Sequence, residues 1–195
     1  MKKALTLAAL FAISAAAQAT TIFSDNFDAN PLLVNAVPGG GWTVTDGTVD
    51  IIGPGFYSYC AVGQGKCIDL DGSTWNAGVL SKSFDLTAGV QYTASFELAG
   101  NQRNHFDDMV AVSFGSTNSS FTLAAADAFA AYQLVFTPGT SGTYSLSFAN
   151  NGGDNIGALL DNVSVTAVPE PETYAMLLAG LGLLGAAQRR KSKAA

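Results

Sequence analysis

Carboxylates are the most frequent chemically active side chains in the middle of this chain. They fall into four groups along the sequence: Asp25 and Asp28, Asp69 and Asp71, Asp107 and Asp108, and Asp154 and Asp161. Calcium binds six to eight oxygens at about 2.3–2.6 Å, which carboxylates and loop carbonyls supply readily. The alternative is that these Asp residues cap turns and accept hydrogen bonds from their own backbone. Residue types alone leave both interpretations open.

The segment GNQRNHFDD, residues 100–108, is the most polar part of the chain and holds its only His. Planar polar groups such as Arg103 and His105 can fix sugar hydroxyls, so we consider them candidate glycan ligands. Trp42, Tyr57 and Trp75 are the candidate aromatic surfaces for stacking. The alternatives are that such aromatic residues belong to the core and that a polar loop is simply solvated.

A catalytic function is not predicted. A nucleophilic triad would need His105 as its base, and the sequence has no G-x-S-x-G elbow, zinc motif or phosphate-binding glycine loop. A carboxylate pair for glycoside hydrolysis depends on a separation that only the fold sets. We therefore expect a protein that is not an enzyme, with structural calcium as the one cofactor considered.

The N-terminal residues 1–19, MKKALTLAALFAISAAAQA, have the pattern of a signal peptide. A basic start precedes an apolar run over 4–13, and Ala17-Gln18-Ala19 forms a small-x-small cleavage site. The alternative is a buried N-terminal helix. Cleavage would leave a mature start near Thr20 in an exported, oxidising environment.

Export gives the two cysteines a role. Cys60 and Cys67 enclose AVGQGK, in which Gly63 and Gly65 permit a tight reversal. The spacing favours a hairpin disulfide. A metal site is disfavoured because no His lies nearby, and two free thiols are the remaining alternative.

Charge and composition restrict the function classes. Only 12% of residues are charged, and within residues 20–168 thirteen acidic side chains face three basic ones, a balance of −10. Such a segment has no basic footprint for phosphates, so nucleic acid is not an expected partner. The abundance of Gly, Thr, Val and aromatic residues is typical of short strands joined by turns.

Alternating apolar and polar residues predict an all-β fold over residues 20–167. Strands are expected within 41–52, 78–86, 91–99, 109–115, 132–137, 142–150 and 158–167. Asp46-Gly47 interrupts the first of these and is a strong hairpin signal. About ten strands in one domain indicate an antiparallel β-sandwich with Greek-key or jelly-roll connections.

The order of several motifs resembles the galactose-binding-like jelly roll of carbohydrate-binding modules. FSDNFD, GGGW, CIDLDGS, LSKSFDLTAGVQYTASFELAGNQR and IGALLDNVSV follow one another across residues 23–165. The resemblance implies a structural calcium that joins a carboxylate near the first strand to one at the last. Asp28 and Asp161 are then the candidate ligands, with Asp25 or Asp71 assisting.

The C-terminal segment 168–195 reads VPEPETYAMLLAGLGLLGAAQRRKSKAA. Its two prolines predict an extended, accessible linker. The apolar run over 175–187 predicts a short transmembrane helix, although about 20 Å of helix falls short of a ~30 Å hydrocarbon core. The cations that follow favour a cytoplasmic end. An ordinary anchor and a membrane-surface helix are the alternatives.

This segment resembles the PEP-CTERM sorting signal of Gram-negative bacteria that produce exopolysaccharide. The matching residues are Val168, Pro169, Glu170, Pro171, Thr173, Arg189, Arg190 and Lys191. The resemblance implies that exosortase, an integral membrane enzyme, processes the chain near Pro-Glu-Pro after transient anchoring in the inner membrane.

The expected product is a non-catalytic protein of the outer surface or extracellular matrix that binds a glycan in an exopolysaccharide layer. A purely structural matrix protein is the main alternative, and a glycan hydrolase is a weaker one.

Overall fold

The computed structural model describes residues 19–61, 63–103, 105–168, 177–183 and 185. Residues 19–168 form one compact unit. Residues 1–18 of the predicted signal peptide and the sorting residues after Val168 lie outside the described residues. Residues 177–183 are helical. Within the described part of the chain no helix is both long and apolar enough to cross a membrane, so the predicted transmembrane helix is not shown.

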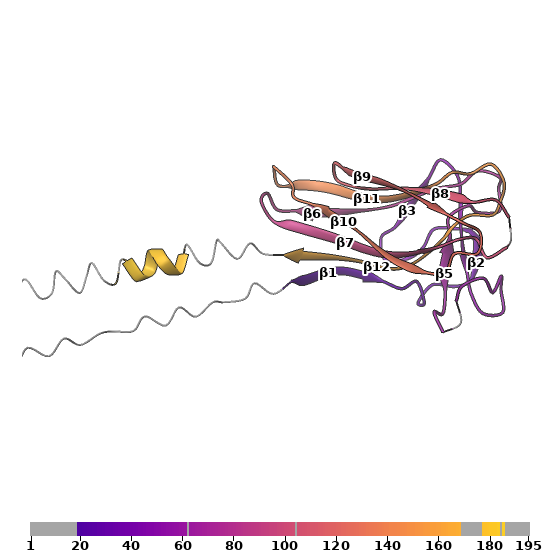
Figure 1. Ribbon diagram of the computed structural model, residues 1–195, viewed down its shortest axis with the longest axis horizontal. Helices are drawn as coiled ribbons and strands as arrows, with labels where there is room; N and C mark the ends of the chain where they lie inside the picture. The colour runs from indigo at the N-terminus through magenta and orange to yellow at the C-terminus, as the bar shows by residue number, and fades with distance from the viewer. Residues whose placement is uncertain (1–18, 62, 104, 169–176, 184, 186–195) are drawn as a thin grey trace, which may run out of the picture. The chain divides into compact units, whose positions relative to one another are not determined.

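Twelve strands build the unit, which confirms the predicted all-β sandwich (Figure 1). The strands are β1 (Thr20–Asp25), β2 (Leu33–Ala36), β3 (Thr43–Thr45), β4 (Val49–Ile52), β5 (Cys67–Asp69), β6 (Val79–Leu86), β7 (Gln91–Ala99), β8 (Asp108–Phe114), β9 (Thr117–Leu123), β10 (Ala130–Phe136), β11 (Gly142–Asn150) and β12 (Leu159–Val168).

The strands form two antiparallel sheets. One has the order β10-β7-β12-β5-β4-β2, with β1 also paired to β12, and the other has the order β3-β6-β11-β8-β9. Most connections therefore cross between the sheets, as in a jelly roll. Pairing of Thr20 with Ala167 brings the start of β1 beside the end of β12, and both lie at one end of the sandwich (Figure 1).

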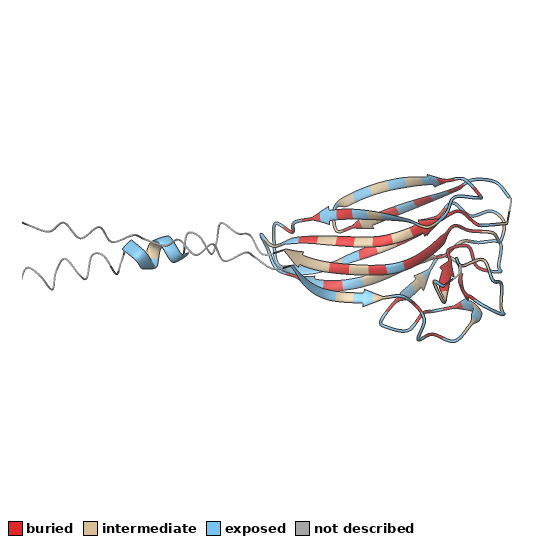
Figure 2. Cartoon of the chain, turned by 60° about the horizontal axis from the view of Figure 1, so that its bottom comes forward, coloured by how far each residue is buried: buried red, intermediate tan, exposed pale blue. Residues whose placement is uncertain are grey.

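The core lies between the sheets and follows from the period of two in the sequence. In β7, the side chains of Tyr92, Ala94, Phe96 and Leu98 point inward and are buried, whereas the residues between them are more exposed. The same banding runs along the other long strands (Figure 2). Full burial of each large apolar side chain contributes about 1.5–3 kcal/mol relative to exposure.

The hairpin predicted at Asp46-Gly47 is wrong. The chain does turn there, but β3 pairs with β6 in one sheet whereas β4 pairs with β2 and β5 in the other. The reason is a close approach to the β5–β6 connection. The Thr48 N–H donates to Asn76 O over 3.0 Å, and a Cβ at Gly47 would lie 2.3 Å from that oxygen.

The predicted disulfide between Cys60 and Cys67 is confirmed. It joins the 53–66 connection to the first residue of β5. The connection covers a small second cluster whose buried members, Ile52, Cys67, Ala99 and Leu159, are separate from the main core. Tyr59 and Phe129 pack against this cluster. The disulfide thus fixes a long connection against one sheet.

Candidate functional site

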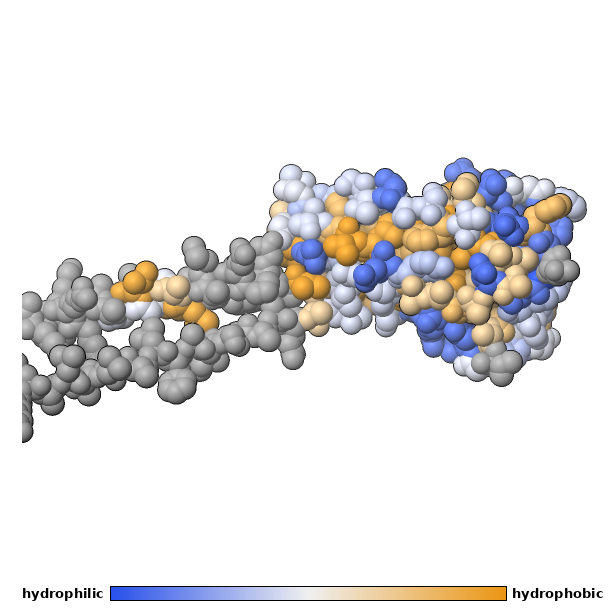
Figure 3. Space-filling view, viewed as in Figure 1, coloured by the Kyte–Doolittle hydropathy of each residue, from blue (hydrophilic) through white to orange (hydrophobic). Residues whose placement is uncertain are grey.

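Three connections meet at the end of the sandwich away from Thr20 and Val168, and we call this region the loop end. They are residues 70–78 between β5 and β6, 100–107 between β7 and β8, and 151–158 between β11 and β12. Pairing of Leu159 with both Asp69 and Ala99 places the three connections beside one another. Hydrophilic side chains gather over this end of the molecule (Figure 3).

Arg103 ties the loop end together. Its guanidinium forms an ion pair with Asp69 and donates to the carbonyl oxygens of Asn155 and Gly157, both over 3.4 Å. Its Cζ atom also lies 4.9 Å from the ring centroid of Tyr59, within cation–π range. The side chain is only 16% exposed. These contacts hold the three connections together, and the role of Arg103 as a glycan ligand stays a prediction.

Two further carboxylates of the loop end are buried with hydrogen-bond partners. Asp69 Oδ1 accepts from the Asp71 and Gly157 N–H groups over 3.1 and 3.0 Å. Burial raises the pKa of Asp69, whereas Arg103 and these donors oppose that rise. Asp108 accepts from the Asn101 side chain over 2.8 Å, and its pKa is also raised by burial.

Asp71 differs from these carboxylates because it is fully buried without a partner. Neither of its side-chain oxygens accepts a hydrogen bond from any residue that the structure describes. Burial raises its pKa to about 6, and the charges of Asp154 and Asp108 add to the rise. The sequence resemblance grouped Asp71 with Asp28 and Asp161. In the structure its acidic neighbours are instead those of the loop end.

Exposed aromatic side chains lie on the same loops. Trp75 is 68% exposed, and Phe106 is 79% exposed. His105 links two of the loops, because its Nδ1 lies 3.3 Å from Asp154 Oδ2. Within its own loop, the His105 ring lies 4.7 Å from the ring of Phe106. Tyr57 is also exposed but belongs to the 53–66 connection. Phe106 was not among the predicted site residues, although a Phe within the most polar segment was a signal for it.

Trp42 is not a surface platform, which corrects the sequence prediction. It is 4% exposed and packs in the main core against Phe23, Phe27 and Phe148. Its indole N–H donates to Asp25 Oδ2 over 2.9 Å. The side chain therefore has no face for a ligand.

A second group of acids forms where β1 meets β12. Asp161 is fully buried, and its Oδ2 has no partner within the described part of the chain. Burial raises the pKa of Asp161 to about 7, and the charges of Glu97, Asp28 and Asp25 add to the rise. Of the four predicted calcium ligands, Asp25, Asp28 and Asp161 thus lie near enough for their charges to interact, whereas Asp71 belongs to the loop end.

Asp25 also makes a contact of the turn-capping kind, whereas Asp28 is bonded to the distant residue Lys66. Asp25 Oδ1 accepts from the Phe27 N–H over 2.8 Å, and Asp28 Oδ1 accepts from the Lys66 N–H over 2.8 Å. Lys66 Nζ further donates to the Asp28 carbonyl over 2.7 Å. No three His, Cys, Asp or Glu side chains of the described residues converge enough to hold a metal by themselves. Calcium here stays a prediction.

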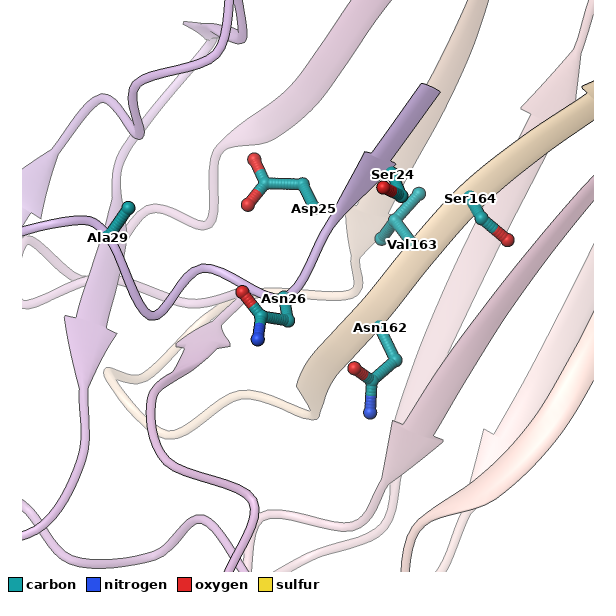
Figure 4. A pocket seen from close by; sticks show the side chains of 7 residues that line it. All are labelled: Ser24, Asp25, Asn26, Ala29, Asn162, Val163 and Ser164. Atoms are coloured by element: carbon teal, nitrogen blue, oxygen red, sulfur yellow. The ribbon is translucent and has the colours of Figure 1, made fainter. Parts of the chain in front are cut away.

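A surface pocket of about 580 Å³ opens beside this second group (Figure 4). Asp25 and Asn26 approach it from the end of β1, and Asn162 and Ser164 approach it from β12. Its lining is completed by Ser24, Ala29 and Val163. No aromatic side chain lines the pocket, so it offers no surface on which a sugar ring could stack.

Solved structures share this fold at low sequence identity. The CBM22-1 xylan-binding domain of Paenibacillus barcinonensis Xyn10C is 16% identical, with 80% of this chain and 99% of that domain covered at a TM-score of 0.52. The K1 cleaved adhesin domain of Lys-gingipain from Porphyromonas gingivalis W83 is 14% identical, with coverages of 75% and 97% and a TM-score of 0.52.

The Clostridium thermocellum xylanase 10B, with CBM22-1 and GH10 modules, is 13% identical at a TM-score of 0.52. The match covers 77% of this chain but only 29% of the xylanase chain. At these identities the likeness shows the fold alone.

Among curated proteins no match was found. The profile of the PEP-CTERM protein-sorting motif matches residues 167–191, which begin at the end of β12. The resemblance that the Pro-Glu-Pro tail suggested is thereby confirmed. The chain carries a PEP-CTERM protein-sorting motif directly after a β-sandwich with the fold of carbohydrate-binding modules.

Proposed function

We propose that this chain is an exported substrate of exosortase whose β-sandwich ends at the outer surface or in the extracellular matrix of a Gram-negative bacterium. The observation that carries the proposal is the sorting motif at residues 167–191. It begins where β12 ends, so removal of the tail would leave every strand of the sandwich intact. The predicted signal peptide, residues 1–19, would supply export.

The experiment is to map the C-terminus of the mature protein by mass spectrometry in cells with and without exosortase. Processing near Pro169-Glu170-Pro171 should occur only when exosortase is present. A variant with Pro169 and Pro171 both changed to Ala should keep its tail. An intact tail on the mature protein of wild-type cells would contradict the proposal.

Glycan binding by the loop end is the finer part of the proposal. Exposed Trp75 and Phe106 offer stacking faces, and His105 offers a polar group beside Phe106. Recognition sites of this kind combine a few such polar groups with apolar and aromatic surface. The loop end also lies opposite Val168, so a glycan bound there would not cover the start of the sorting motif.

Structural calcium is a further proposal for the group formed by Asp25, Asp28 and Asp161. Its fit rests on Asp161, since a buried carboxylate oxygen without a donor is what a cation would satisfy. The three carboxylates supply only hard oxygen donors, which suit calcium rather than a soft metal. Bound there, calcium would hold β1 to β12 at the point where their pairing begins.

A purely structural matrix protein is the rival function. It would have the same sorting and fold but no saccharide site, and loss of Trp75 or Phe106 would then leave its interaction with exopolysaccharide unchanged. A glycan hydrolase is less favoured, because Asp69, Asp71 and Asp108 are buried and hence cannot reach a substrate.

A further inference from the structure

Asp71 is the one carboxylate of the loop end that is buried and without a donor. Its neighbours Asp69 and Asp108 accept hydrogen bonds from N–H groups and side-chain amides. Asp50 accepts from the Ser73 hydroxyl over 2.7 Å. Both oxygens of Asp71, by contrast, have no donor within the part of the chain that the structure describes. Such a group calls for a proton or an ion to satisfy it.

The surrounding charge is strongly negative. Asp154, Asp108 and Asp50 all act on the Asp71 carboxylate in the direction that disfavours its ionised form. Among the described residues the cation that acts on it is Arg103, and this guanidinium is already paired with Asp69. An ionised carboxylate in a buried site costs several kcal/mol unless a positive charge compensates it. Within the described residues, Asp71 therefore has no positive charge of its own to compensate it.

The backbone around Asp71 is held in place by hydrogen bonds and close packing. Its N–H is held by Asp69 Oδ1 over 3.1 Å. A Cβ added at Gly157 would lie 2.4 Å from the Asp71 nitrogen and 2.8 Å from its Cβ. The following residue is fixed as well, because the Gly72 N–H donates to Thr48 O over 2.9 Å. The buried position of the side chain is built into the packing of the two loops.

We propose that Asp71 anchors a calcium site at the loop end, separate from the group formed by Asp25, Asp28 and Asp161. Asp154 and Asp108 are the carboxylates whose charges act most strongly on Asp71. Because no three acidic side chains of the described residues converge on one point, loop carbonyls and waters supply the other ligands. Calcium accepts such a mixed oxygen set, whereas zinc prefers thiolate and imidazole ligands.

The site joins elements that the sandwich itself leaves apart. Asp71 belongs to the loop that carries Trp75, and Asp154 belongs to the loop that contacts His105. A cation between them fixes the first loop relative to the third. This inference does not rest on glycan binding, since it concerns the cation alone.

The test is calorimetric titration of CaCl2 into the purified full-length chain after treatment with EDTA. The wild type should bind calcium at the Asp71 site, and Asp71→Asn should bind one equivalent fewer. Asp161→Asn is the matched control, because it removes a buried carboxylate oxygen without a partner from the other acidic group. This variant should still bind the calcium ion at the Asp71 site. Equal stoichiometry for Asp71→Asn and the wild type, or no calcium binding by the wild type, overturns the proposal.

Thermal unfolding separates loss of the site from loss of the fold. In EDTA, Asp71→Asn should melt at or above the wild-type temperature, since the variant removes an uncompensated buried charge. Calcium at about 100 times its Kd should raise the melting temperature of Asp161→Asn by roughly 5–10 °C and leave that of an Asp71→Asn, Asp161→Asn double variant unchanged. The proposal is overturned if Asp71→Asn melts at a lower temperature than the wild type in EDTA and the melting temperature of Asp161→Asn does not respond to calcium. Asp71 would then be a protonated side chain with a structural role.

Discussion

The indole N–H of Trp42 donates to Asp25 Oδ2 over 2.9 Å, and this bond joins two residues that the sequence assigned to different sites. Trp42 was a candidate sugar platform, and Asp25 was a candidate calcium ligand. The indole ring lies in the core, while Asp25 is the last residue of β1. A buried indole N–H needs an acceptor, so this contact holds the end of β1 against the core.

Trp42→Phe should lower the free energy of unfolding by roughly 1–3 kcal/mol, because it removes the donor to Asp25 and leaves a gap in the core. Urea unfolding measures the change. The slope of the unfolding free energy against urea concentration should equal that of the wild type. The exposed Trp75→Phe is the matched control and should stay within about 0.5 kcal/mol of the wild type. Glycan affinity should be unchanged in Trp42→Phe. A variant of normal stability with weakened glycan binding would argue for a surface role of Trp42.

The sequence predicted the long strands well because their alternation is local. The predicted strands over 91–99 and 142–150 coincide with β7 and β11. Pairing between strands is not local, however. The signal at Asp46-Gly47 identified a turn, but it could not show that the contact between Thr48 and Asn76 sends β3 and β4 into different sheets.

The candidate site was less accessible to sequence reasoning for the same reason. The acidic residues were recognised by type, but only the fold separates Asp71 from Asp161, since their grouping depends on which loops meet. Burial of Trp42 depends on which face of the chain meets the second sheet, and no local pattern near GGGW encodes that. Arg103 was predicted as a sugar ligand from its planar polar group, yet its partners Asp69 and Gly157 lie 34 and 54 residues away.

Arg103→Met should destabilise the fold by roughly 3 kcal/mol, because it leaves the Asp69 carboxylate buried without its counter-charge. Adding Asp69→Asn should restore much of that loss, since an Asn side-chain oxygen can still accept from the Asp71 and Gly157 N–H groups. A double-mutant cycle by urea unfolding gives the coupling. Additive effects of the two substitutions would show that the ion pair does not organise the loop end.

Trp75→Ala and Phe106→Ala should each weaken binding to isolated exopolysaccharide roughly tenfold, which corresponds to about 1.4 kcal/mol. Both side chains are exposed, so stability should change little. Affinity electrophoresis measures the binding of all variants in the same way. Val135→Ala, which trims an exposed apolar residue of β10, is the control and should bind as the wild type does. Unchanged binding by both aromatic variants would favour the purely structural function.

In EDTA, stability should fall as the pH rises from about 4 to about 7, and Asp161 should account for a defined part of this fall. The pKa of its carboxyl is raised from 3.8 to about 7 in the folded state, chiefly by burial. Between these two values the folded protein keeps a proton that the unfolded chain has lost, so its stabilising effect is complete below pH 4 and disappears as the pH passes 7. The change corresponds to roughly 4 kcal/mol.

Asp161→Asn should remove this contribution, and urea unfolding of both proteins across the pH range measures it. At pH 8, calcium should restore the stability of the wild type by more than that of Asp161→Asn, because the cation replaces the proton on the buried carboxylate. Parallel pH profiles for the two proteins would refute the raised pKa. An identical gain in stability from calcium in the two proteins would refute the role of Asp161 as a calcium ligand. Measuring Asp71→Asn in the same way separates the calcium response of the loop end from that of β1 and β12.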